Sequence, residues 1–165
     1  MMLRLAKVLL LAAVAFFYTL VVFNNITDYG SNYQFVHHVL LMDSTFSDNH
    51  GMWRAIHPVL THKVFYDGII AWEALTMILC WAGCARLLRM LRKPAEVFHI
   101  AKNVAICGLM FSLLMWLVAF LSVGAEWFLM WQSKTWNGQE AAFRMFMVVA
   151  VILIFLALPE REAQP

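Results

Sequence analysis

Four long apolar runs dominate the chain, and polar stretches separate them. They cover about residues 5–23, 64–88, 97–127 and 140–158. A helix that crosses a membrane needs about 20 mostly apolar residues, because each residue advances about 1.5 Å and the hydrocarbon core is roughly 30 Å thick. The pattern therefore predicts an all-α fold: a transmembrane four-helix bundle that forms a single domain over residues 1–165.

The four runs differ in how cleanly apolar they are. The second carries one charged residue, Glu73, in its interior. The fourth is the weakest, because only residues 145–158 are free of charge, and Arg144 must therefore reach the membrane interface or find a partner. The first follows the basic residues Arg4 and Lys7, as in a signal peptide, but no small-x-small cleavage site ends it. We expect this run to form an uncleaved first helix.

One long polar segment, residues 24–62, separates the first two runs and forms the predicted outer loop. Within it, apolar residues recur at helical spacing, namely Phe35, Val36, Val39, Leu40 and Met42. This spacing predicts a short amphipathic helix from about Ser31 to Met42, lying on the membrane surface or against the bundle. Residues 43–49 are rich in turn formers and end it.

Basic residues are distributed unevenly between the two sides of the predicted bundle. One side holds Arg4, Lys7, Arg86, Arg89, Arg92, Lys93, Lys102 and Arg161, and the other holds Arg54, Lys63, Lys134 and Arg144. Lysine and arginine concentrate in the short cytoplasmic loops of membrane proteins. We therefore predict that the connection between the second and third helices is cytoplasmic. With an even number of spans, both termini are then cytoplasmic as well.

Composition supports a lipid environment. Hydrophobic residues make up 63% of the 165 residues and charged residues 13%, with a mean hydropathy of +0.73. Soluble domains are about half apolar and about a quarter charged, so this chain could not cover its apolar surface in water. A net charge of +2 is too small to indicate a nucleic-acid partner. Cys80, Cys84 and Cys107 all lie in apolar runs, which favours packing over a disulfide framework.

Glu73 is the most informative polar residue of the spans. A carboxylate at this depth costs at least a few kcal/mol unless it is compensated, so we expect it to face the bundle interior. The structural interpretation makes it a hydrogen-bonded clasp to a neighbouring helix, with Thr19, Ser112 or Arg144 as the partner. Two functional interpretations remain beside it. One is contact with a ligand or partner, and the other is relay of protons or cations, with Tyr66 above it.

Histidines gather in the long polar segment, where they suggest metal binding. His50, His57 and His62, with Asp43 or Asp48, are ligand types that suit zinc or copper. Their seven- and five-residue spacings match no strong metal motif. No histidine lies at the middle of a span, as intramembrane haem requires, and neither a phosphate-binding glycine loop nor a nucleophile elbow occurs. We predict no catalytic residue, no metal ligand and no cofactor.

A longer pattern resembles a known family. Its residues are Asn24-Asn25-Ile26-Thr27-Asp28-Tyr29-Gly30-Ser31-Asn32, Phe35-Val36, His38-Val39, Met42-Asp43, Trp53-Arg54-Ala55-Ile56 and Glu73. With them the chain resembles, over nearly its whole length, a family of predicted small bacterial integral membrane proteins classed as a domain of unknown function. The resemblance implies a bacterial inner-membrane protein with four spans and brings no activity. It marks as candidate functional residues Asn25, Asp28, Tyr29, Asn32, His38, Asp43, Trp53, Arg54 and Glu73.

Three functions of different classes fit these observations. The first is an accessory or interaction subunit of an inner-membrane complex, which binds a membrane-protein partner or a second copy of itself. The second is a small transporter or ion-coupled carrier that uses Glu73, although no broken-helix signature accompanies it. The third is a membrane enzyme that acts on lipid or quinone at the outer face, with Asp28, His38, Asp43 and His57 as its polar residues. We favour the first, because the sequence contains no catalytic constellation.

Overall fold

A computed structural model describes residues 1–160 as a bundle of helices. The helices long and apolar enough to cross a membrane are α1 (Met2–Thr27), α3 (Val59–Arg89), a third span composed of α4 (Ala95–Ala101), α5 (Asn103–Leu114) and η2 (Met115–Trp127), and α6 (Gln139–Ala157). Shorter elements are α2 (Tyr29–Leu41), η1 (Met52–Arg54) and η3 (Met130–Gln132). No strand occurs within residues 1–160, and the predicted all-α bundle is confirmed. Arg161, part of the predicted charge bias, lies outside the described residues.

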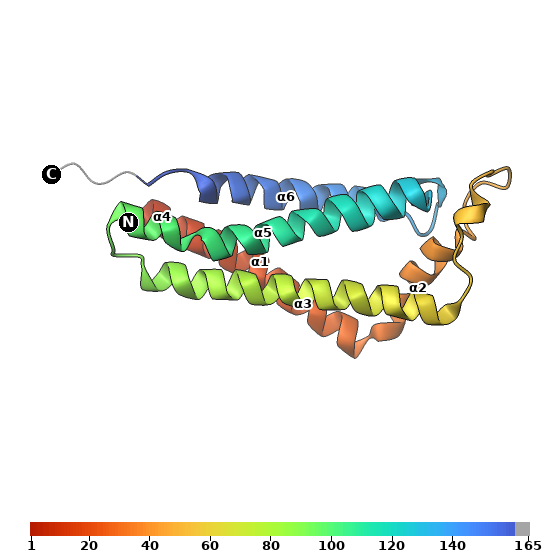
Figure 1. Ribbon diagram of the computed structural model, residues 1–165, viewed down its shortest axis with the longest axis horizontal. Coiled ribbons are helices and arrows are strands. Elements are labelled where there is room, and N and C mark those ends of the chain that lie inside the picture. The colour runs from red at the N-terminus through yellow and green to blue at the C-terminus, as the bar shows by residue number, and fades with distance from the viewer. Residues whose placement is uncertain (161–165) are drawn as a thin grey trace.

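The long helices lie along one common axis, and α1 crosses it obliquely (Figure 1). α3 packs against α1 on one side and against α5 on another, and α6 packs against α5 and η2. The start of α1, the α3–α4 connection and the end of α6 lie together at one end of the bundle, which we call the terminal end. α2, η1 and η3 lie at the opposite end, which we call the loop end.

Small residues bring α3 and α5 into close contact. A methyl group at Gly83 would lie 2.8 Å from Cα of Ala105, and one at Gly108 would lie 2.9 Å from Sγ of Cys80. Lipid tails are as apolar as leucine, so helices in a membrane associate through close packing of this kind rather than through the hydrophobic effect. Cys80 is buried at this contact, whereas Cys84 is buried with its Sγ 4.0 Å from the carbonyl oxygen of Val8 on α1, and both are free. Their predicted role in helix packing is confirmed.

The third span changes its winding along its length. α4 and α5 meet at Lys102, and from Met115 the backbone continues as a π-helix as far as Trp127. At its end the amide of Phe128 donates to the carbonyl of Val123, five residues earlier, at 3.0 Å. The apolar run predicted this span but not its transition from α-helix to π-helix, because hydropathy does not depend on how a helix is wound. Segments of π-helix are rare and often accompany functional sites.

The predicted amphipathic helix of the long polar segment is confirmed as α2. Asp28 separates it from α1 with non-helical dihedral angles (φ −126°, ψ 57°), and Met42 ends it in the left-handed region (φ 54°). Val36, Val39 and Leu40 form its buried face. α2 packs this face against the rest of the bundle at the loop end, where α3 is its main neighbour.

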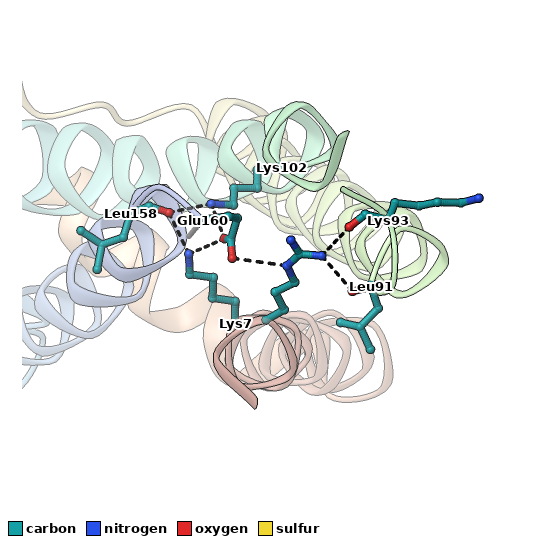
Figure 2. A network of polar contacts seen from close by, with 7 residues as sticks. Lys7, Leu91, Lys93, Lys102, Leu158 and Glu160 are labelled. Carbon is teal, nitrogen blue, oxygen red and sulfur yellow. Dashed lines mark hydrogen bonds and ion pairs between the residues drawn. The ribbon is translucent and has the colours of Figure 1, made fainter. Parts of the chain in front are cut away.

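A buried group of ions closes the terminal end (Figure 2). Nζ of Lys7 and Nζ of Lys102 lie 2.6 and 2.7 Å from Oε1 of Glu160, and Nε of Arg4 lies 3.5 Å from its Oε2. Both lysines also donate to the carbonyl oxygen of Leu158, at 2.8 and 2.7 Å. We call Arg4, Lys7, Lys102 and Glu160 the Glu160 cluster. It joins α1, the α4–α5 junction and the segment after α6.

Gly83 gives a direct test of the α3–α5 contact. Because a methyl group there would overlap Ala105, we expect Gly83→Leu to reduce the free energy of unfolding in detergent by about 1–3 kcal/mol. Gly30→Leu is the matched control, since a methyl group at Gly30 meets no atom within 4 Å. Equal stability of the two variants would contradict the packing described here.

Glu160 predicts a dependence of stability on pH. Burial raises the pKa of its carboxyl, but hydrogen bonds from Lys102 and Lys7 outweigh burial and leave the pKa below its ordinary value of 4.5. A carboxyl whose pKa is lowered by folding stabilises the protein above its unfolded pKa and loses this effect as the pH falls through its folded pKa. We expect Glu160→Gln to unfold at a lower temperature than wild type at pH 7, with the difference shrinking below about pH 4.

The exposed Glu140 supplies the control for this pH series. Its side chain is 85% exposed. Glu140→Gln should unfold at nearly the wild-type temperature throughout the same pH range, because an exposed ion pair contributes little. If both variants follow the same pH profile, the Glu160 cluster does not stabilise the terminal end.

Candidate functional site

Glu73 lies on α3 inside the bundle, and Asn25 near the end of α1 holds its carboxylate. Nδ2 of Asn25 donates to Oε2 of Glu73 at 2.6 Å, and both side chains are buried. Oδ1 of the same amide accepts from Nδ2 of Asn32 on α2 at 2.7 Å and from the hydroxyl of Tyr66 on α3 at 3.2 Å. We call these four residues the Asn25 network. A single amide thus connects α1, α2 and α3.

The Asn25 network supports the interpretation of Glu73 as a clasp but changes its partner. The three predicted partners are engaged elsewhere: Thr19 with Ala15 and Trp81, Ser112 with Tyr18, and the exposed Arg144 with Glu140. The predicted partners were therefore wrong. The reason is the length of α1, which was expected to end near residue 23 but continues to Thr27. Asn25 is thereby a helical residue facing Glu73 instead of part of the loop.

Tyrosines cover the Asn25 network on the side of the loop end. The ring of Tyr29 meets the edge of Tyr66 with centroids 4.7 Å apart and stacks on Tyr33 at 5.9 Å. The hydroxyl of Tyr29 donates to Oδ1 of Asp67 at 2.9 Å. Burial and this carboxylate raise the pKa of Tyr29 to about 12, so the hydroxyl keeps its proton at neutral pH. Tyr29 and Tyr33 thus pack against Tyr66, a member of the Asn25 network.

Two histidines fasten α2 to α3. Nε2 of His62 lies 2.7 Å from the carbonyl oxygen of Ile56 and donates to it. Nδ1 of a neutral His62 then accepts from Nδ1 of His37, at 2.8 Å. Burial, with His62 and His38 nearby, lowers the pKa of His37, which favours the neutral ring at pH 7. Within residues 1–160, no group of three or more histidine, cysteine or acidic side chains is arranged to hold a metal ion.

Asp28, His38 and Asp43 make local contacts that are separate from Glu73. Oδ2 of Asp28 accepts from Oγ of Ser31 at 2.7 Å, at the start of α2. Nδ1 of His38 lies 2.7 Å from Oδ2 of Asp43, and its ring stacks on Trp136 with centroids 4.6 Å apart. Of the candidate residues, the structure therefore brings Asn25, Asn32 and Glu73 together. Asp28 lies apart from them at the start of α2, and the pair of His38 and Asp43 lies at another place.

Trp53 and Arg54 form a third group, at the loop end. The guanidinium of Arg54 lies 5.3 Å from the ring centroid of Trp53 and 5.1 Å from that of Trp127. Its Nη1 donates to the carbonyl oxygen of Trp127 at 3.2 Å, which ties η1 to the end of η2. Trp53 is 72% exposed. Aromatic side chains with a polar neighbour are typical of the membrane–water interface.

An apolar groove of about 470 Å³ lies between α2, α3 and η2. We call it the α2–α3–η2 groove. Its lining contains no charged residue and consists of Phe35, Val36, Val39, Leu40, Val64, Phe65, Gly68, Ile69, Trp72, Val118, Ala119, Phe120, Val123, Gly124, Phe128 and Met130. Its volume is in the range of ligand sites, but such sites carry a few polar groups that orient the ligand. The groove is therefore suited to an apolar occupant.

Sequence reasoning missed the groove and the Glu160 cluster. The groove is formed by three segments far apart in the chain, so no local pattern marks it. Lys7 and Lys102 were interpreted as indicators of topology, and Lys7 also as part of a start like that of a signal peptide. The available signal was Glu160, an acidic residue three positions beyond the last apolar helix, at the end where the basic residues were expected to gather.

The Asn25 network makes a prediction that separates a clasp from a relay. Glu73→Gln keeps an oxygen that accepts from Asn25, so we expect the free energy of unfolding to change by less than about 1 kcal/mol. Asn25→Ala leaves the carboxylate without its donor, and we expect a loss of about 2–3 kcal/mol in the same detergent unfolding assay. If Glu73→Gln keeps its stability but abolishes a cellular phenotype of the protein, a relay is supported instead.

Comparison with known proteins places this arrangement in a family. The family model described as "Predicted small integral membrane protein (DUF2165)" matches residues 3–159. No curated protein and no solved structure matches the chain. The match covers all four apolar spans, α2 and the Asn25 network, in agreement with the resemblance noted in the sequence. The protein therefore belongs to the DUF2165 family of predicted small integral membrane proteins.

Proposed function

We propose that the protein is an interaction subunit of a membrane complex, and that its α2–α3–η2 groove receives a transmembrane helix of a partner protein. The observation that carries this proposal is Gly68. A methyl group at Gly68 would meet no atom within 4 Å, although the residue lies within α3 and lines the groove. Gly83 and Gly108, in contrast, are required by the contact between α3 and α5.

A glycine inside a helix costs about 1 kcal/mol relative to alanine. At Gly83 the close approach of α5 offsets this cost, but no described residue approaches Gly68. Small residues in membrane helices let a second backbone come close. A partner helix seated over Gly68 supplies the contact that the chain itself does not make.

The shape of the groove also favours a helix. Val64, Gly68 and Trp72 line it at intervals of four residues along α3. This row extends for about 12 Å in the direction of the helix axis. The opposite wall is η2, so the groove is bounded by two elements that run along the bundle. A partner helix of similar direction can place apolar side chains into it over about two turns.

The candidate residues Glu73 and His38 are engaged in internal contacts, which is consistent with a role in interaction. Glu73 is hydrogen-bonded by Asn25, and His38 is paired with Asp43. The alternatives of an ion-coupled carrier that uses Glu73 and of an enzyme at the outer face stay predictions. An interaction subunit requires no group to bind an ion or to react, and its specificity lies in the fit of the groove.

We also propose that the protein is located in a bacterial inner membrane, with both termini in the cytoplasm. The start of α1, the α3–α4 connection and the end of α6 share the terminal end, and the basic side chains of Arg4, Lys7 and Lys102 gather there. The aromatic group of Trp53 and Trp127 lies at the opposite end. This distribution agrees with the concentration of basic residues on the cytoplasmic side.

Gly68→Leu tests the proposed function. The tagged protein is expressed at its native level, extracted in mild detergent, and its stoichiometric partners are quantified by mass spectrometry. Because leucine fills the space above Gly68, we expect recovery of the partner to fall about tenfold, which corresponds to about 1.4 kcal/mol. The unfolding temperature of the variant should not fall, since leucine favours the helix.

Ala71→Leu is the matched control for this experiment. It adds the same side chain at an exposed position of α3 that does not line the groove, and it should leave partner recovery unchanged. Wild-type protein that is recovered alone, or a partner that Gly68→Leu retains in full, would exclude the groove as the docking site.

A further inference from the structure

The Glu160 cluster holds more positive than negative charge. Three cationic side chains, Arg4, Lys7 and Lys102, converge on one carboxylate, and within residues 1–160 no other acidic side chain lies within ion-pair distance of them. The side chains of both lysines are fully buried, and that of Arg4 is 14% exposed. Buried cations are costly unless they are paired with an anion, so these side chains require an anionic group at the place that Glu160 occupies.

The lysines also retain donors for an anionic ligand. Each ammonium has three N–H groups. In the described part of the chain, Lys7 and Lys102 each donate to Leu158 and to Glu160, which accounts for two of the three. A carboxylate offers two acceptor oxygens, whereas a phosphodiester offers two anionic oxygens and its ester oxygens. A phosphate in the place of Glu160 could accept from all three cationic side chains.

An apolar groove adjoins the cluster on the surface between α1 and α6. It has a volume of about 600 Å³ and is lined by Leu10, Met147, Val148, Val151, Ile152 and Phe155. Phe155 connects the two features, because its ring centroid lies 5.8 Å from Nζ of Lys7. Leu10 follows Lys7 by nearly one turn of α1. Phe155 thus lies between the apolar groove and the buried basic cluster.

We propose that the Glu160 cluster and this α1–α6 groove together form a binding site for an anionic phospholipid. The phosphate contacts Arg4, Lys7 and Lys102, and one acyl chain lies in the groove beside Val151. Glu160 occupies the place of the phosphate in the structure described here. Carboxylate and phosphodiester each carry one negative charge, so lipid binding exchanges one acceptor for the other. Basic pockets between membrane helices are suited to anionic headgroups for this reason.

The charge of the cluster selects among lipids. An anionic lipid such as phosphatidylglycerol adds only negative charge near the three cations. Phosphatidylcholine carries a phosphate as well, but it also brings a quaternary ammonium close to Arg4, Lys7 and Lys102. Like charges disfavour this arrangement, because their repulsion is only weakly screened at a buried site. The site therefore prefers phosphatidylglycerol.

Lipid binding is measured on the full-length, delipidated protein by native mass spectrometry, with phosphatidylglycerol and phosphatidylcholine as probes. We expect wild type to bind phosphatidylglycerol more tightly than phosphatidylcholine. Glu160→Gln removes the competing carboxylate, and the affinity for phosphatidylglycerol should rise about tenfold. Glu140→Gln, at the other end of α6, should behave as wild type. Equal affinity for the two lipids, or no gain in Glu160→Gln, overturns the proposal.

A second pair of variants tests the groove without altering the cluster. Val151→Trp fills the groove and should lower phosphatidylglycerol affinity at least about tenfold, while Ile154→Trp, at an exposed position of α6 outside the lining, should not. Both positions face outward, so folding is expected in both variants. Unchanged binding in Val151→Trp contradicts a bound acyl chain.

Inorganic phosphate is the remaining probe, and it distinguishes a lipid from a free anion. We expect millimolar phosphate to displace little phosphatidylglycerol, because phosphate lacks the acyl chain. If phosphate binds Glu160→Gln as tightly as phosphatidylglycerol does, and Val151→Trp leaves both affinities unchanged, the cluster is a site for a soluble anion and the lipid assignment is overturned.

Discussion

The bundle depends on the hydrogen bond from Asn25 to Glu73, because it compensates a carboxylate at membrane depth. The two atoms lie 2.6 Å apart, and both side chains are buried. The same amide accepts from Asn32 and Tyr66, so α2 cannot move from its place without disturbing the carboxylate. The position of α2 in turn forms one wall of the α2–α3–η2 groove. The requirement to supply a hydrogen bond to one buried acidic side chain thereby shapes the surface at which we propose that a partner binds.

Much of the fold could be predicted from the sequence, since hydropathy and helical spacing are local properties. Four spans, an amphipathic helix in the long polar segment and an inward-facing Glu73 all follow from patterns within about 20 residues. The partner of Glu73 could not be predicted in this way. The end of α1 was inferred from where the apolar run ends, and Asn25 lies beyond that point. Inward-facing polar residues such as Asn25 extend a membrane helix beyond this point when the bundle satisfies their hydrogen bonds, and only the tertiary arrangement reveals that.

The candidate residues form separate groups in the structure, and the sequence could not predict these groups because they depend on tertiary contacts. Asn25, Asn32 and Glu73 meet at one place, whereas His38 with Asp43 and Trp53 with Arg54 fasten separate parts of the loop end. A family pattern marks residues that matter but does not say which of them touch. The groove and the Glu160 cluster draw on segments that are distant in the chain, so their formation depends on packing that no local pattern encodes. Their chemistry, apolar at one end and basic at the other, differs accordingly.

The bonds to Leu158 and Glu160 also have a consequence for the order of assembly. Synthesis proceeds from the N-terminus, so Lys7 and Lys102 are made well before the segment that neutralises them. Until α6 has entered the bilayer, both ammonium groups lie at the edge of an incomplete bundle and are best solvated by water or lipid headgroups. Burial of the two lysines can follow only when the fourth span is in place. Closure of the terminal end therefore requires insertion of the fourth span.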